Sequence, residues 1–234
     1  MRRTFVLVHG AWHGGWCWRR VCDPLEGLGH KVYAPTLAGL ADRSHLLSPA
    51  IDLAAHASDI ANLIKWERLE DVVLVGHSYG GMVVTEVAER VAPAIASIVY
   101  LDAFLPEPGQ RLLDLASPAT RKAIEEAIAT GATSLKPIPP AVFGVNEADR
   151  AWVEAMCTPQ PAGTFTQAVS GTRGRDAIPR RTYIRASAYA SPSFDAALTK
   201  AKALPGWSTY EVDCGHDVMV DSPQRLVEIL IERA

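Results

Sequence analysis

The most constraining feature of the chain is a serine placed between glycines where a strand-like segment meets a helix-like segment. Residues 72–75 read VVLV, residues 76–80 read GHSYG, and residues 81–84 continue as GMVV. Glycines two positions either side of the serine let a strand and a helix approach each other through a tight, strained turn. G-x-S-x-G in this context is typical of a nucleophile elbow, which exposes a serine hydroxyl above a sheet. We therefore predict that Ser78 is a nucleophile.

Two backbone amides are expected to face this serine. The turn directs the N-terminal amides of the following helix at the site, where they stabilise a developing oxyanion, so the Tyr79 amide is one candidate donor. The first strand-like segment, residues 4–8, runs into HGAWHGGW at residues 9–16. Its glycines permit unusual dihedral angles, and we predict that the Ala11 amide is the second donor.

Other functions for this glycine-containing loop find less support. His9 and His13 are possible metal ligands, but no carboxylate or third histidine with a recognisable spacing accompanies them. The loop also lacks G-x-G-x-x-G and the glycine-lysine ending of a phosphate-binding loop. We predict no metal and no organic cofactor. His77, at the variable position of the serine motif, is expected to be a packed, hydrogen-bonded histidine.

The candidate general base follows the last strand-like segment, residues 208–212. Residues 213–219 read DCGHDVM, which places His216 in a glycine-containing loop just before the C-terminal helix. From there an imidazole can accept the Ser78 proton and return it to a leaving group. The alternative is a surface loop histidine.

The acid that orients this base is harder to place. The strand-like segment 181–185 is followed by ASAYAS at residues 186–191, which contains no carboxylate. Asp102 follows the strand-like segment 96–101, directly after the nucleophile's strand–helix unit, and reaches the same edge of the sheet. We predict Asp102 as the acid. The alternatives are Asp195, no acid contact at all, and a role for Asp102 limited to binding loop amides.

The wider pattern predicts an α/β fold. Short β-branched segments alternate with helical patterns, which favours a mainly parallel sheet with helices on both faces. Ligands bind at the carboxyl ends of the strands in such sheets, so the residues after each strand share one edge. The expected strands are residues 4–8, 31–34, 71–75, 96–101, 181–185 and 208–212, with helices over 53–65 and from Ser222-Pro223 onward.

Residues 105–179 differ from the rest of the chain. Nine prolines interrupt short helical stretches such as residues 121–129 and 147–156. We interpret this region as a small helical cap inserted into a single domain of residues 1–234, where it roofs a pocket. The residues expected to line the pocket, with a place in the core as the alternative, are Trp12, Phe104, Phe143, Trp152, Phe165 and Met219.

Composition excludes several classes of partner. The chain has 234 residues, 48% of them hydrophobic and 21% charged, with a formal net charge of −3. These values predict a globular protein without a basic stripe for nucleic acid. No apolar run approaches the roughly 20 residues that cross a bilayer, and Met1–Thr4 leads into a strand without a signal-peptide core. We expect a cytoplasmic protein without nucleic-acid or membrane partners.

Together, residues 9–16, 76–81 and 215–217 resemble the α/β-hydrolase superfamily, and within it the group of plant methylesterases, hydroxynitrile lyases and related bacterial esterases. The resemblance covers nearly the whole chain. It implies that Ser78 and His216 are nucleophile and base and that the Ala11 and Tyr79 amides form an oxyanion hole. A homodimer is implied by the resemblance alone.

Two departures favour hydrolysis within this group. Hydroxynitrile lyases carry threonine where Gly10 stands and lysine where Asp217 stands, and that lysine stabilises departing cyanide. A third departure is the missing acid after Arg185, where relatives carry aspartate. An acid in the position of Asp102 has precedents in the superfamily, including some lipases and cofactor-independent dioxygenases.

The resulting prediction is a serine esterase that cleaves a small, largely apolar carboxylic ester through an acyl-enzyme on Ser78. Lactonase, lyase and cofactor-free oxygenase reactions at the same site are alternatives, the last with His216 deprotonating the substrate. A further alternative is a non-catalytic small-molecule binder, which the missing acid after residue 185 suggests.

Overall fold

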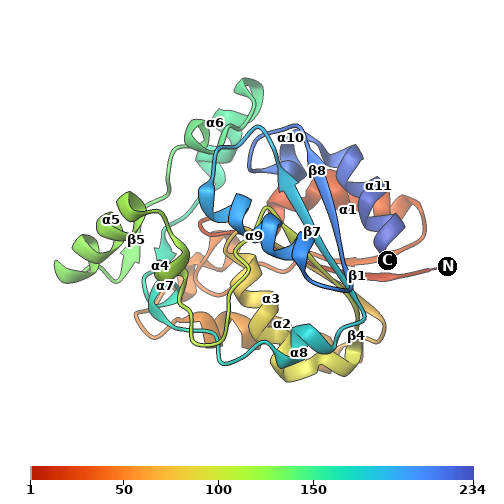
Figure 1. The fold of residues 1–234 in the computed structure, drawn as a ribbon. Helices are drawn as coiled ribbons and strands as arrows, with labels where there is room; N and C mark the ends of the chain where they lie inside the picture. The colour runs from red at the N-terminus through yellow and green to blue at the C-terminus, as the bar shows by residue number, and fades with distance from the viewer. Residues whose placement is uncertain (1) are drawn as a thin grey trace.

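A six-stranded sheet forms the centre of the molecule (Figure 1), as seen in a computed structural model that describes residues 2–234. All neighbouring strands pair in parallel, in the order β2-β1-β3-β4-β7-β8. The predicted α/β fold with a mainly parallel sheet is thereby confirmed. The strands are β1 (Thr4–Val8), β2 (Lys31–Tyr33), β3 (Val72–His77), β4 (Ile95–Leu101), β7 (Arg180–Ala186) and β8 (Trp207–Val212).

Apart from β1, the strand limits differ from the predicted ones by one or two residues, and the difference matters at β3. This strand continues two residues past the predicted end, because Gly76 and His77 still pair with Tyr100 and Leu101 of β4. The β3 residues are all buried, as expected for a strand covered on both faces. The serine motif therefore begins inside the sheet.

Helices cover both faces of the sheet and bury two hydrophobic clusters. Alternate strand residues point to opposite faces, so Val6 and Val8 join one cluster while Phe5 and Leu7 join the other. The first cluster lies under α2 (Leu53–Trp66), α3 (Gly80–Val91) and α9 (Pro192–Ala203), and α8 (Arg173–Ala177) packs on α3. The second lies under α1 (Arg19–Gly27), α10 (Val218–Asp221) and α11 (Pro223–Arg233). Short 3-10 turns are η1 (Gly15–Trp18), η2 (Ala41–Leu46) and η3 (Ala92–Ala94).

The chain between β4 and β7 leaves the sheet and forms a cap. In Figure 1, α4, α5 and β5 lie at the end of the molecule opposite the chain termini. The predicted helical stretches fall in α5 and α6, but a short antiparallel strand pair, β5–β6, was not expected. The cap elements are α4 (Leu112–Leu115), α5 (Pro118–Ala129), β5 (Ser134–Leu135), η4 (Pro140–Phe143), α6 (Glu147–Met156), β6 (Gln160–Pro161) and α7 (Gly163–Thr166).

The last part of this insertion returns to the helical layer. Helix α8 packs against α3 so closely that a Cβ on Gly174 would lie 2.1 Å from the Ala88 carbonyl oxygen. The part of the insertion that lies apart from this helical layer therefore runs from α4 to α7. Within the described residues, every helix is too short or too polar to cross a membrane.

Candidate active site

Ser78 occupies a strained turn between β3 and α3. Its φ is 54°, in the left-handed region that non-glycine residues rarely adopt. The turn is tight because a Cβ on Gly76 would lie 2.5 Å from the Gly80 carbonyl oxygen. Neighbouring backbone holds the strain: Ser78 N–H donates to Leu101 O at 3.2 Å, and Phe104 N–H donates to Ser78 O at 3.2 Å. The elbow is thus fixed from the β4 side as well as by its glycines.

His216 and Asp102 form a short, buried hydrogen bond. Nδ1 of His216 donates to Oδ2 of Asp102 at 2.6 Å, and the two residues are 3% and 0% exposed. The loop is also tied to the cap, because His216 N–H donates to Phe143 O at 2.8 Å. With Nδ1 committed to the carboxylate, Nε2 is the nitrogen available for proton exchange in the cavity. His216 and Ser78 line the same cavity.

Asp102 is held on its other oxygen by β7. Oδ1 accepts from Arg185 Nη1 at 2.8 Å and from the Ala186 amide at 3.0 Å. Arg185 also donates from Nε to Asp195 Oδ1 at 2.9 Å, so its guanidinium bridges the two carboxylates. The Asp195 side chain is 64% exposed. The carboxylate in contact with His216 is therefore Asp102, and the alternative placement of Asp195 beside His216 is wrong.

The two amides expected to face Ser78 are free of protein acceptors. Within the described chain neither Ala11 N–H nor Tyr79 N–H makes a hydrogen bond, and both residues line the cavity. Loop and elbow approach closely, because a Cβ on Gly10 would lie 3.0 Å from Ser78 Cβ. A larger residue at position 10 would push the loop away from the serine.

His9 fixes the peptide that carries the Ala11 amide. Its Nε2 accepts from Leu37 N–H at 3.0 Å, so its Nδ1 carries the proton and donates to Gly10 O at 2.8 Å. Burial lowers the pKa of His9 to about 3, which keeps the ring neutral and this pattern intact. Because C=O and N–H are antiparallel in a trans peptide, holding Gly10 O sets the direction of Ala11 N–H.

A buried ion pair joins the loop after β1 to the residue that follows His216. His13 Nδ1 lies 2.8 Å from Ala11 O and Nε2 lies 3.1 Å from Asp217 Oδ2. Both partners are acceptors, so only the imidazolium form satisfies them together. Burial opposes charge on both side chains, yet Asp217 raises the pKa of His13 and His13 lowers the pKa of Asp217.

One cluster of side chains has the geometry of a possible metal site. His77, His216 and Asp217 each offer one potential metal-ligand atom, and these atoms lie within 4.8 Å of one another. Hydrogen bonds already occupy much of this cluster. His77 Nε2 donates to His216 O at 3.0 Å, and His216 Nδ1 donates to Asp102. Burial lowers the pKa of His77, which keeps it neutral. His77 is thus a packed, hydrogen-bonded residue, and the cluster fits a hydrogen-bonded network better than a metal centre.

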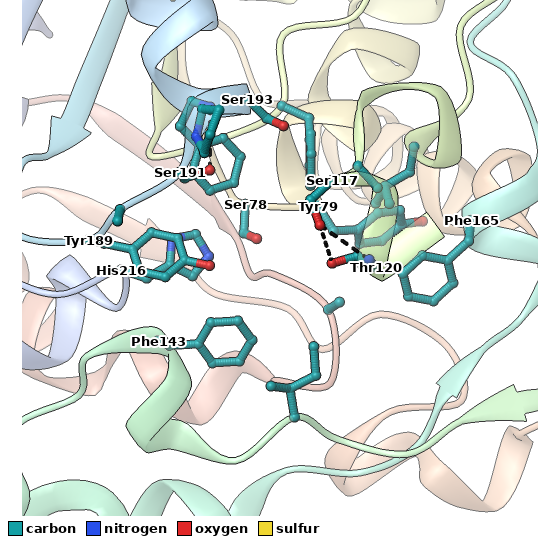
Figure 2. Close-up of a pocket in the computed structure, with 18 of the residues that line it drawn as sticks. Ser78, Tyr79, Ser117, Thr120, Phe143, Phe165, Tyr189, Ser191, Ser193 and His216 are labelled. Carbon is teal, nitrogen blue, oxygen red and sulfur yellow. Dashed lines mark hydrogen bonds between the residues drawn. The ribbon is translucent and has the colours of Figure 1, made fainter. Parts of the chain in front are cut away.

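The cavity above Ser78 has a volume of about 330 Å³ and an aromatic wall. Figure 2 shows Phe143 and Tyr189 around His216, with Tyr79, Thr120 and Phe165 on the other side of Ser78. The Phe194 ring stacks on the His216 imidazole, with centroids 5.3 Å apart and planes 12° apart. The residues predicted from the sequence that line this cavity are Ala11, Trp12, Ser78, Tyr79, Phe104, Phe143, Phe165 and His216.

Two residues predicted to line the pocket lie elsewhere. Met219 is fully buried in the hydrophobic cluster under α1 and α11, because α10 turns it towards the sheet. Trp152 packs its ring 5.1 Å from the Trp16 ring and beneath the Arg20 guanidinium. Both assignments are therefore corrected. The presence of an apolar residue in the cap or at the strand-end rim does not show which side of it meets the cavity.

The sequence prediction missed part of the wall. Tyr189, Ser191 and Phe194 line the cavity from the loop after β7 and the start of α9. Their position just past the carboxyl end of a strand is the signal that could have indicated them. Ser117 and Thr120, at the start of α5, add hydroxyl groups to the opposite wall.

A parallel α/β sheet, a serine elbow and a buried histidine–carboxylate pair define a hydrolase of the α/β class. The chain matches the Alpha/beta hydrolase family over residues 5–229, and it belongs to this family. It is 41% identical to a carbendazim hydrolyzing esterase of Nocardioides sp. (strain SG-4G), over 97% of this chain and 98% of that relative. The predicted carboxylic ester hydrolase is confirmed by this relationship.

Two more distant similarities were also found. The chain is 36% identical to Methylesterase 1 of Arabidopsis thaliana over 108 residues, which are 45% of this chain and 41% of that protein. A solved extracellular alpha/beta-hydrolase from a Paenibacillus species has a TM-score of 0.86, covers 99% of both chains and is 24% identical. This likeness shows the same fold.

Proposed function

We propose that Ser78, His216 and Asp102 form the catalytic triad of this esterase and that the Ala11 and Tyr79 amides form its oxyanion hole. The observation that carries the proposal is the 2.6 Å bond from His216 Nδ1 to Asp102 Oδ2, at a cavity that Ser78 also lines. A buried carboxylate in this position fixes the tautomer of the base and stabilises the imidazolium that forms.

The chemistry runs through an acyl-enzyme. Ser78 Oγ attacks the ester carbonyl carbon while His216 Nε2 takes its proton, and the two amides bind the resulting oxyanion. Collapse breaks the carbon–oxygen bond of the ester, and His216 returns the proton to the departing alkoxide. Water then attacks the acyl carbon and gives a proton to His216, which passes it to Ser78 Oγ as the carboxylic acid leaves. The Phe194 face stabilises the imidazolium in both steps.

The substrate that fits best is a small-alcohol ester of a flat aromatic acid. Trp12, Phe104, Phe143, Phe165 and Phe194 all line a cavity of about 330 Å³, which holds an aromatic acyl group and little more. One relative supports a small leaving alcohol, since it is a methylesterase, and another relative hydrolyses carbendazim.

The experiment compares aromatic and aliphatic methyl esters. Wild type is expected to hydrolyse methyl 2-naphthoate and carbendazim with a higher kcat/KM than methyl decanoate, while Ser78→Ala loses at least about 10³-fold in kcat. Retained hydrolysis by folded Ser78→Ala would overturn the proposed mechanism. Preference for the long aliphatic ester would overturn the proposed substrate class only.

Lactonase, lyase and oxygenase reactions would use the same residues, and no contact in the site favours them over ester hydrolysis. Asp217 places a paired carboxylate, not a lysine cation, beside the base loop. A cytoplasmic location and a homodimer stay predictions from the sequence.

A further inference from the structure

Trp12 follows the proposed oxyanion donor Ala11, and the cap holds it with three hydrogen bonds. Its N–H donates to Gln160 Oε1 at 3.0 Å, and its Nε1–H donates to Leu135 O at 3.0 Å. Its carbonyl accepts from Thr158 N–H at 2.9 Å. Leu135 and Gln160 are paired residues of the β5–β6 ladder. The cap is therefore attached directly to the loop that carries the oxyanion donor.

Trp12 needs outside contacts to keep its conformation. Its φ is 65°, in the left-handed region that a bulky side chain avoids. Such a backbone persists only where the surroundings over-determine it. Two of its three cap contacts are made by the backbone itself, so the cap acts on the strained residue directly.

The orientation of the Gln160 amide is fixed by its neighbours. Its Nε2 donates to Thr164 Oγ1 at 2.9 Å, and Thr164 Oγ1 donates to Pro161 O at 2.6 Å. Thr164 has thus used its proton and accepts from Gln160, which leaves Oε1 as the atom that faces Trp12. Gln160 is fully buried and is not among the residues that line the cavity.

The peptide between Ala11 and Trp12 is held at both of its polar atoms. Ala11 O accepts from His13 Nδ1 at 2.8 Å, and Trp12 N–H donates to Gln160. This peptide and the Gly10–Ala11 peptide meet at the Ala11 Cα. Displacement of the Ala11–Trp12 peptide shifts this shared Cα and, with it, the Ala11 N–H, whose direction His9 sets through Gly10 O.

We propose that Gln160 is a positioning residue that sets the Ala11 amide of the oxyanion hole through Trp12. The inference rests on the proposed function of Ser78 and Ala11. Gln160 acts from the cap without touching substrate, so its loss slows the chemical step and leaves substrate binding nearly unchanged.

Three variants test this role. Gln160→Met keeps the length of the side chain and removes the acceptor for Trp12 N–H, whereas Gln160→Glu keeps an acceptor oxygen. Thr166→Val is the matched control, because it removes a cap hydroxyl bond to Gly163 O without touching Trp12. Gln160→Met is expected to lose about 10- to 100-fold in kcat with KM within about twofold. Thr166→Val stays within about threefold of wild type, and Gln160→Glu, which keeps an acceptor for Trp12 N–H but loses the donor to Thr164, falls between that control and Gln160→Met.

A second readout reports the oxyanion hole itself. A trifluoromethyl ketone carrying ¹³C at its carbonyl adds to Ser78 as a hemiketal, and the pH dependence of its ¹³C shift gives the pKa of the hemiketal hydroxyl. A misplaced Ala11 amide stabilises the anion less, so this pKa rises by about one unit or more in Gln160→Met. A packing change that leaves the amide in place does not move it.

The outcomes separate the two proposals. Wild-type kcat and hemiketal pKa in folded Gln160→Met, or in Gln160→Leu if the methionine variant does not fold, overturn the role of Gln160. Failure of wild-type protein to form the hemiketal overturns the nucleophilic role of Ser78, and the role of Gln160 with it.

Discussion

Arg185 donates a hydrogen bond to Asp102 across 2.8 Å, on the carboxylate oxygen that His216 leaves free. Both side chains are almost fully buried, so the contact is a buried ion pair beside the proposed base. β7 thus contributes a cation to the site, and the carboxylate comes from the end of β4. The guanidinium offsets the cost of burying the negative carboxylate of Asp102. That carboxylate then interacts with two partners, the Arg185 guanidinium and the His216 imidazolium.

Arg185→Met should lower kcat/KM by about 10- to 100-fold, because Asp102 loses one of its anchors. Arg185→Lys, which keeps a cation, should recover part of this loss. Steady-state rates of both variants and wild type test this, and an unchanged kcat/KM in folded Arg185→Met contradicts it.

Asp102→Asn should reduce kcat by about 10³- to 10⁴-fold, because an amide offers neither the charge nor the tautomer control of the carboxylate. Asp195→Asn is the matched control, since Asp195 binds the same guanidinium without contacting His216. That variant should retain activity within about fivefold. Equal losses in the two variants would show that Asp102 acts only through Arg185.

Asp217→Asn should destabilise the protein by about 3 kcal/mol, because it leaves buried His13 without its counter-ion. The pKa of His13 is raised in the native state, so its contribution is complete below about pH 6.5 and is lost as pH rises through the higher native value. The pKa of Asp217 is lowered, so its contribution is lost only in acid below its usual value of 3.8. Urea unfolding should therefore show a larger difference between the proteins at pH 5.5 than at pH 9. An equal difference at both pH values would argue against a charged pair.

His9 and His56 should make the protein sensitive to acid. Burial lowers the pKa of His9 to about 3 and that of His56 to about 4. Below about pH 6.5 the unfolded chain binds protons at both residues and the native state does not, so stability falls as pH falls. Each residue lowers the free energy of unfolding by up to about 1.4 kcal/mol for each unit by which the pH falls.

His56→Gln should therefore flatten the dependence of unfolding free energy on pH between 6 and 4.5 by about 1.4 kcal/mol per unit, which urea titrations at several pH values can measure. His45→Gln serves as the control, since that residue lies on an exposed turn. An identical slope in wild type and His56→Gln would show that His56 is not a buried neutral group.

The fold and the local motifs of the site can be predicted from the sequence, because the elbow and the loop after β1 are continuous segments. Asp102 is predicted because no carboxylate directly follows residues 181–185 and Asp102 follows the strand at residues 96–101. The structure places its carboxylate against His216. The roles of Arg185 and Gln160 were not accessible in this way. Their decisive contacts join residues 83 and 148 positions apart, to Asp102 and Trp12, and only the folded chain brings those pairs together.

The most direct measurement of the central claim is the mass of the protein trapped during turnover of a p-nitrophenyl ester. Wild type should gain one acyl group, and peptide mapping should place it on Ser78, while Ser78→Ala should gain none. An acyl group on another residue, or turnover by Ser78→Ala without a covalent adduct, would contradict the assignment of Ser78 as the nucleophile.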